Sequence, residues 1–153
     1  MAFRAGIIVT SPDSSEIILI VETQLAIKNL QETESQLKRY MLHVGCPVGL
    51  VVTPDKLRIY KDQYLSSSLD SVRRVAEFDI SKVLNFRSQD PQIEEREFLL
   101  EQRVQEWLEK LPANLDLPQY EPSLKDALRW HVLPAIFEGT IQAGGLRYTS
   151  RTT

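Results

Sequence analysis

The chain contains very few of the residues that build disulfides and common metal sites. It has one cysteine, Cys46, in 153 residues, so it cannot form an internal disulfide. Its two histidines, His43 and His131, have no cysteine or carboxylate at metal-ligand spacing. This usage argues against a disulfide-stapled secreted scaffold and a zinc site, and it leads us to expect a reducing, cytoplasmic compartment.

Long apolar runs are also missing. No segment approaches 18 unbroken apolar residues, so we expect no membrane-spanning helix and no membrane partner. The first residues lack a basic region followed by an apolar core and a cleavage site, so we expect no secretory signal. The sequence also lacks a Gly-rich phosphate loop and a nucleophilic-serine elbow. These absences argue against P-loop nucleotide-binding proteins and common serine hydrolases.

The overall composition is that of an ordinary globular domain, with 42% hydrophobic and 25% charged residues. A net charge of −3 argues against a protein coated in basic surface, but the charge is unevenly distributed. Residues 1–88 hold 11 Lys and Arg against 10 Asp and Glu, whereas residues 89–111 hold 3 against 7. Most of the acidity lies in one short stretch, so the N-terminal part can present a local basic face to phosphate.

Residues 16–24 are the stretch around which we expect the fold to be organised. Five apolar residues in a row, Ile17 to Val21, are followed by a carboxylate and an amide, Glu22 and Gln24. An uninterrupted run of this length predicts a central strand that is buried on both faces. Polar groups at the end of such a strand mark where open α/β sheets keep their chemistry.

The segment upstream predicts an antiparallel hairpin with this strand. Residues 3–10 read as a strand and residues 11–15 as a turn rich in Ser, Pro and Asp. With a three-residue loop, opposed residues have numbers that sum to about 28, so Ile8 faces Ile20 and Gly6 faces Glu22. Because side chains alternate along a strand, this register gathers four residues on one face at the open end of the hairpin. They are Arg4, Gly6, Glu22 and Gln24.

The rest of the chain predicts further helices and strands. Thr33 and Gln36 have capping-box spacing and open a helix that Gly45 ends. Asp90 and Pro91 open the clearest helix of the chain, as its cap and its first residue. The other expected elements are strands over residues 47–53, 57–60 and 72–78, a short helix over 80–86, and a helix over 123–137 that bends at Pro134 and ends at Gly139.

The helix over residues 92–111 is acidic on one side and apolar on the other. Its apolar face packs either on the sheet or against a second subunit. Together these elements predict an α/β fold with a mixed sheet flanked by helices, in one domain over 1–139. We expect a core over 3–88, a helical extension over 89–139 and a flexible tail over 140–153. The shared helix face comprises Glu97, Leu100, Val104, Trp107, Leu108 and Leu111.

The order of motifs in the first part of the chain resembles the PD-(D/E)XK nuclease superfamily. The hairpin and Glu22-x-Gln24 are followed by Gln36-x-x-x-Tyr40 and by a strand ending in Leu57-Arg-Ile-Tyr60. This order is more narrowly similar to the N-terminal nuclease domain of type I restriction enzyme R subunits, over roughly residues 3–62. The resemblance implies a restriction-endonuclease-like fold, Mg²⁺-dependent nuclease chemistry and a nucleic-acid partner, DNA rather than RNA.

The resemblance also assigns roles to individual residues. In the family, two carboxylates hold Mg²⁺ beside the scissile phosphate and a lysine orients the attacking water. Glu22 matches the metal-binding glutamate, whereas Gln24 stands at the lysine position and Gly6 at the aspartate position. Two of three catalytic groups are thus altered, which predicts a nucleic-acid-associated module with a degraded Mg²⁺ site. Arg4, Gln36 and Tyr40 then support the site or contact nucleic acid.

Two alternatives remain at this stage. Pro12-Asp13 followed by Glu22-x-Gln24 matches the bare motif, which would give an active Mg²⁺-dependent endonuclease that uses Glu22, Asp13 and Gln24. An extended strand would, however, hold Asp13 roughly 20 Å from Glu22, at the opposite end. The other alternative is a non-enzymatic interaction protein that forms a homodimer through the acidic helix 92–111.

Overall fold

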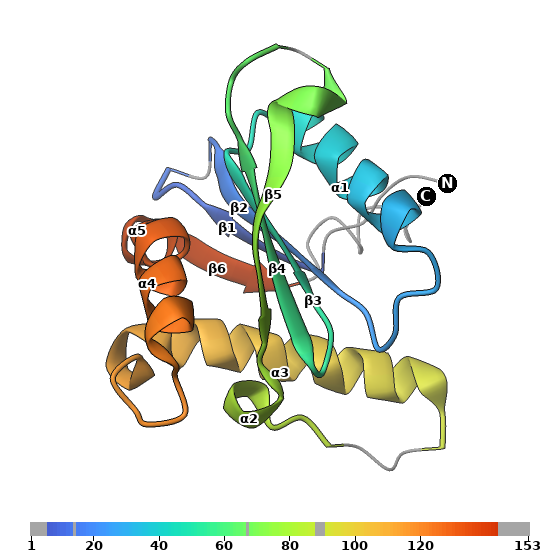
Figure 1. The fold of residues 1–153 in the computed structure, drawn as a ribbon, viewed down its shortest axis with the longest axis vertical. Coiled ribbons are helices and arrows are strands. Elements are labelled where there is room, and N and C mark those ends of the chain that lie inside the picture. The colour runs from blue at the N-terminus through green and yellow to red at the C-terminus, as the bar shows by residue number, and fades with distance from the viewer. Residues whose placement is uncertain (1–5, 14, 67, 88–90, 144–153) are drawn as a thin grey trace.

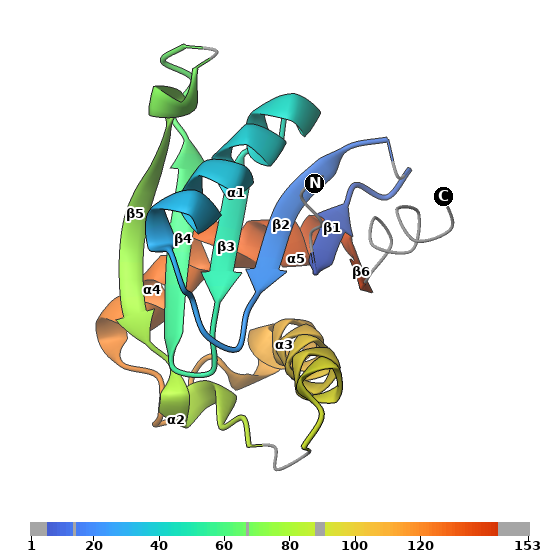
Figure 2. The same cartoon turned by 90° about the vertical axis from the view of Figure 1, so that its right-hand side faces the viewer.

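A mixed β-sheet forms the centre of the fold in the computed structural model, which describes residues 6–13, 15–66, 68–87 and 91–143. Its strands are β1 (Ile7–Thr10), β2 (Ile17–Thr23), β3 (Val48–Val52), β4 (Lys56–Asp62), β5 (Val72–Asp79) and β6 (Thr140–Ala143). Figure 1 shows the sheet nearly edge-on, and Figure 2 shows its strands from left to right in the order β5-β4-β3-β2-β1-β6. The strand β2 is therefore central, and the α/β class expected from the sequence is confirmed.

The hairpin of β1 and β2 has the predicted register from Ile7 to Val9 and shifts by one residue at Thr10, which lies opposite Ile17. Ile8 lies opposite Ile20 in an antiparallel pair, and the Gly6 amide donates to the Val21 carbonyl at 3.0 Å. On its other side β2 pairs in parallel with β3, which places Glu22 beside Val51. The run Leu19 to Val21 has no solvent exposure, as a strand covered on both faces requires.

Helices cover both faces of the sheet. They are α1 (Leu30–Val44), α2 (Ser81–Leu84), α3 (Ile93–Asn114), α4 (Pro122–His131) and α5 (Leu133–Glu138). Figure 2 shows α1 in front of the sheet and α4 and α5 behind it. Two buried clusters separate these layers, because α1 packs with Ile20 and Val51, whereas α3, α4 and α5 pack with Val21 and Leu50. We call these the α1 face and the α3 face of the sheet.

The helix α1 begins earlier than its capping-box pattern predicts. Asn29 is the cap, and its side-chain oxygen accepts from the Glu32 amide at 3.1 Å. Thr33 is instead buried inside the helix, so the predicted start was wrong. The predicted end is confirmed, because Gly45 adopts the left-handed conformation with φ of 72°.

Two other helix starts also differ from the sequence pattern. Gln92 precedes α3, so Pro91 is not its first residue, and Asp90 lies outside the described residues. The sequence predicted that another helix begins at Ser123. In the structure this helix is α4, which has Pro122 in its first turn. The expected bend lies at Val132, and Pro134 occupies the first turn of α5, where proline needs no amide hydrogen.

The apolar face of α3 is buried against its own sheet. Trp107 is 3% exposed and donates from Nε1 to the Tyr120 hydroxyl at 2.9 Å, and Leu111 has no exposure. These side chains are therefore not accessible to a second subunit. We expected Glu97 to be the polar residue on this face, and that prediction was wrong. Glu97 is exposed, and Glu101 is the acid that is buried on this face.

The segment 140–143 is a strand and not part of a flexible tail. As β6 it pairs antiparallel with β1, with Thr10 opposite Thr140. Gln142 Nε2 also donates to Thr10 Oγ1 at 3.2 Å. The expectation of a flexible tail was wrong for these four residues, and residues 144–153 lie outside the described part.

Candidate functional site

Polar side chains form two rows across the sheet, at the carboxyl ends of β2 and β3. Strand pairing sets laterally neighbouring residues on the same face, and Val51 belongs to the cluster under α1, so the first row lies on the α1 face. The Gln24 amide donates to the Val52 carbonyl at 3.0 Å and continues this pairing by one more step. We call both sets the polar rows, although Val51 in the first row is apolar. The first row contains Glu22, Val51, Arg58 and Glu77, and the second contains Gln24, Thr53, Lys56 and Asp79.

The polar rows bring cations close to the residues that the sequence singled out. Neighbouring strands lie about 4.8 Å apart, so Arg58 on β4 is two strands, or about 10 Å, from Glu22 on β2. The tight turn before β4 fixes Lys56 beside Thr53, whose hydroxyl accepts from the Lys56 amide at 3.1 Å. Lys56 and Arg58 are two residues apart on β4, so they lie on the same face of the sheet.

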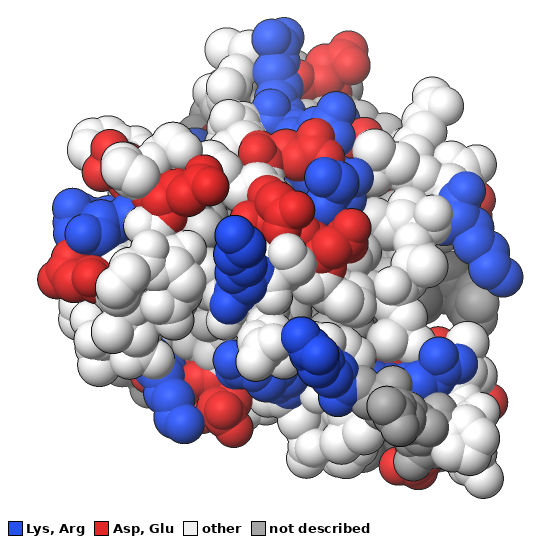
Figure 3. All heavy atoms as spheres, turned by 60° about the horizontal axis from the view of Figure 1, so that its bottom comes forward, with Lys and Arg blue, Asp and Glu red and all other residues white. Residues whose placement is uncertain are grey.

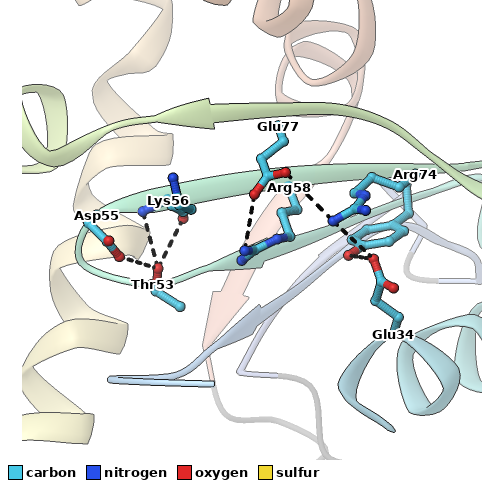
Figure 4. Close-up of polar contacts among 8 residues, drawn as sticks. Glu34, Thr53, Asp55, Lys56, Arg58, Arg74 and Glu77 are labelled. Carbon is cyan, nitrogen blue, oxygen red and sulfur yellow. Dashed lines mark hydrogen bonds and ion pairs between the residues drawn. The ribbon is translucent and has the colours of Figure 1, made fainter. Parts of the chain in front are cut away.

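An ion-pair network holds Arg58 in place (Figure 4). Arg58 Nη2 lies 3.1 Å from Glu77 Oε2, and Arg74 Nη1 lies 3.6 Å from both Glu77 and Glu34. The Tyr60 hydroxyl donates to Glu34 of α1 at 2.5 Å. Burial, followed by this hydrogen bond, raises the pKa of Tyr60 well above its usual value, so it stays a donor at physiological pH. The network thereby ties α1 to β4 and β5.

Gly6 lies against α3 and does not share a face with Glu22. A Cβ built on Gly6 would lie 3.0 Å from Glu101 Oε1 and 3.1 Å from Thr23 Oγ1. Thr23 points to the α3 face, because Val21, two residues before it, belongs to that cluster. The expected grouping was therefore wrong for Gly6, although the strand register is right. Arg4, the fourth member, lies outside the described residues.

Glu101 is a buried carboxylate that we did not single out from the sequence. It is 4% exposed, and its Oε1 fills the space that a side chain at residue 6 would need. Helical periodicity could have found it, since Glu101 is three residues before Val104 and seven before Leu108.

Asp13 lies in the exposed turn between β1 and β2, at the opposite end of β2 from Glu22. Its carboxylate accepts from the hydroxyls of Ser11 and Ser15, each at 2.7 Å, and from the Ser15 amide at 3.0 Å. The structure does not bring Asp13 to Glu22, and these bonds describe a turn residue.

The turn bonds give Asp13 a distinctive titration. The Ser15 hydroxyl, followed by the Ser11 hydroxyl, lowers the pKa of Asp13 to about 2. Its stabilising effect is therefore present above the unfolded value of 3.8 and is lost as the pH falls towards 2. We expect carboxyl NMR to give a pKa near 2, rising in Ser15→Ala. Titration of Asp13 near 3.8 in the native protein would contradict the turn geometry.

Gln36 and Tyr40 lie one turn apart on α1. Gln36 lines a shallow groove along the helix with Glu32 and Arg39. Tyr40 is half-buried against the cluster under α1, and burial raises its pKa. Tyr40 thus packs at the rim of the core.

The described residues contain no group of three or more His, Cys, Asp or Glu arranged to hold a metal ion. Glu22 is the carboxylate at the family positions, since Gln24 is neutral and Gly6 has no side chain. Cys46 is buried, donates to the Val48 carbonyl and has its pKa raised by burial to about 12. It is therefore inert as a nucleophile or ligand at neutral pH.

Comparisons with known proteins give no match to a family model, to a characterised protein or to a solved structure. Among the described residues, no helix combines the length and apolar character needed to cross a membrane. The functional interpretation therefore depends on the polar rows and their neighbours.

Proposed function

We propose that the protein is a restriction-endonuclease-like protein that associates with nucleic acid, DNA rather than RNA, through the polar rows. The order of hairpin, α1, β3 and β4 supports this proposal, because it is the order that the resemblance implies. The position of Glu22 and Gln24 at the carboxyl end of the central strand also supports it.

The observation that carries the proposal is the placement of Lys56 and Arg58 on the α1 face, beside the rows of Glu22 and Gln24. Arg58 is only 12% exposed and is oriented by Glu77, so its guanidinium is presented in a fixed direction. A fixed guanidinium suits bidentate contact with a phosphate.

Mg²⁺ fits these residues poorly. Gly6 offers no ligand and Gln24 carries no charge, so Glu22 would be the single anionic ligand from the family positions. Hard divalent cations are usually held by more than one oxygen anion, with substrate phosphates among them. We therefore propose phosphate binding by the cations of the polar rows, and no metal-dependent step.

The proposal predicts that Lys56→Gln with Arg58→Gln weakens binding to a labelled DNA duplex about tenfold at low salt, because two phosphate contacts are lost. Fluorescence anisotropy measures this affinity. The matched control is Arg103→Gln with Lys110→Gln, which removes the same charge from α3, where both cations pair with Glu106. Figure 3 brings the bottom of the molecule in Figure 1 forward and shows Lys and Arg side chains interspersed with Asp and Glu on that face. Equal affinities for the two double variants would contradict the proposal.

A second candidate, a divalent-dependent nuclease, is favoured by one observation. Glu101 Oε1 lies in the space beside Gly6, the position at which the resemblance implies an aspartate. Cleavage of plasmid DNA with Mg²⁺ or Mn²⁺ that disappears in both Glu22→Gln and Glu101→Gln would support this candidate over the first. Intact plasmid at high enzyme concentration would reject it.

A further inference from the structure

Two cations lie directly opposite each other at the far end of β4, on the α3 face. Lys61 of β4 lies opposite Arg73 of β5. The neighbouring residue Tyr60 is buried on the α1 face, so Lys61 points to the other face. Arg73 Nε donates to the Asp70 carbonyl at 3.3 Å. Within the described residues no carboxylate forms an ion pair with Lys61 or Arg73. Like charges opposed on neighbouring strands are destabilising, and an anion held between them would remove that cost.

A histidine at the end of α4 adds a third group to this pair. His131 Nδ1 is buried and has no hydrogen-bond partner among the described residues. Burial, followed by the charge of Lys61, lowers the pKa of His131. We call Lys61, Arg73 and His131 the basic cluster. Its members come from β4, β5 and the end of α4.

Two exposed aromatic side chains lie close in the chain to members of the basic cluster, Tyr64 after Lys61 and Trp130 before His131. Tyr64 is 71% exposed and Trp130, next to His131, is 74% exposed. Tyr64 has a φ of 56°, and its amide donates to the buried carboxylate of Asp62, which also accepts from Ser71. The Asp62 carboxylate therefore holds the Tyr64 backbone in place at the end of β4, and the Tyr64 side chain is exposed. Rings beside cations are the arrangement on which bases of a single strand stack.

We propose that the basic cluster binds backbone phosphates of a single-stranded nucleic acid, whose bases stack on Tyr64 and Trp130. The choice of nucleic acid over other anions rests on the proposed function. The site itself is separate, because Lys61 and Lys56 lie at opposite ends of β4, about 17 Å apart, and on opposite faces. The polar rows and the basic cluster can therefore hold different parts of one nucleic acid.

The test measures anisotropy of a labelled oligothymidylate and its salt dependence. We expect Lys61→Gln with Arg73→Gln to weaken binding about tenfold and to reduce the slope of log affinity against log salt by about 1.4, for two lost contacts. Tyr64→Ala and Trp130→Ala are each expected to weaken binding about fivefold or more. The double variant should melt at the same or a higher temperature, since it removes a like-charge pair.

The control is again Arg103→Gln with Lys110→Gln, which carries the same change in charge. Equal affinity of the control and the Lys61/Arg73 variant would overturn the proposal. So would binding of labelled polyglutamate as tight as that of oligothymidylate, because the cluster would then be a site for acidic protein segments. Loss of duplex binding in the Lys56/Arg58 variant, with oligothymidylate binding intact, separates this site from the polar rows.

Discussion

Replacing Gly139 with alanine is expected to lower the free energy of unfolding by about 3 kcal/mol, because the added methyl group has no space. A Cβ at this position would lie 2.4 Å from Val9 Cγ1 and 2.6 Å from the Thr10 carbonyl oxygen. The second contact is with backbone of an interior strand, so it cannot be relieved by rotating a side chain. Urea unfolding monitored by the fluorescence of Trp107 and Trp130 measures the change.

Gly45→Ala is the comparison for this variant. Gly45 has a φ of 72° but no atom within 4 Å of an added Cβ, so its substitution costs only backbone strain, about 1 kcal/mol. A Gly139→Ala protein as stable as Gly45→Ala would show that the corner between α5 and β6 does not pack on β1 as described.

Gly6→Asp, which introduces a carboxylate beside Glu101, is expected to destabilise the protein by about 3 kcal/mol at pH 7. The new carboxylate would lie against Glu101 Oε1, which is 3.0 Å from the Cβ position, in a site that is only 4% exposed. Two close carboxylates cannot both ionise without cost, so the loss should shrink as the pH is lowered from 7 to 5. Chemical unfolding at both pH values measures it.

The interaction can be isolated with a double-mutant cycle. Gly6→Asp with Glu101→Ala moves the acid from α3 to the strand, so we expect a favourable coupling of about 1–2 kcal/mol between the two changes. Gly6→Ala measures the steric part of the loss in unfolding free energy, because it adds a Cβ without a charge. If Gly6→Asp costs no more than Gly6→Ala, the Glu101 carboxylate does not fill the space beside Gly6.

The hairpin is the part of the fold that local sequence determines most fully. The turn after Thr10 sets the loop length, and the apolar run from Ile17 to Val21 sets the faces, so the register of Ile8 and Ile20 followed from local pattern. The local pattern did not predict the face of the sheet on which Gly6 lies, because glycine has no side chain whose polarity would indicate a face.

Other errors came from features that involve distant parts of the chain. Asn29 caps α1 although the capping-box pattern at Thr33 is also good, and burial of Thr33 under the helix decides between them. The helix start near Pro91 failed for a similar reason, because the local signal competes with packing further along the helix. Strand β6 has only four residues and gains its stability from β1, so no local pattern could announce it.

The candidate site was predictable in part. The position of Glu22 and Gln24 at a strand end was read from the sequence, whereas the cations beside them required the lateral pairing of β2 to β5. Lys61 and Arg73 are 12 residues apart, and only the register of β4 and β5 makes them neighbours. Sequence spacing therefore locates residues along one strand better than it locates neighbours across the sheet.

The pairing of β6 with β1 also constrains when the protein can complete its fold during synthesis. Gln142 and Thr10 are 132 residues apart, so the N-terminal strand leaves the ribosome long before its outer partner exists. During that interval β1 presents an unpaired edge, which neighbouring nascent chains can also recognise. Emergence of residues 140–143 is thus the step that allows β1 to be paired on both sides.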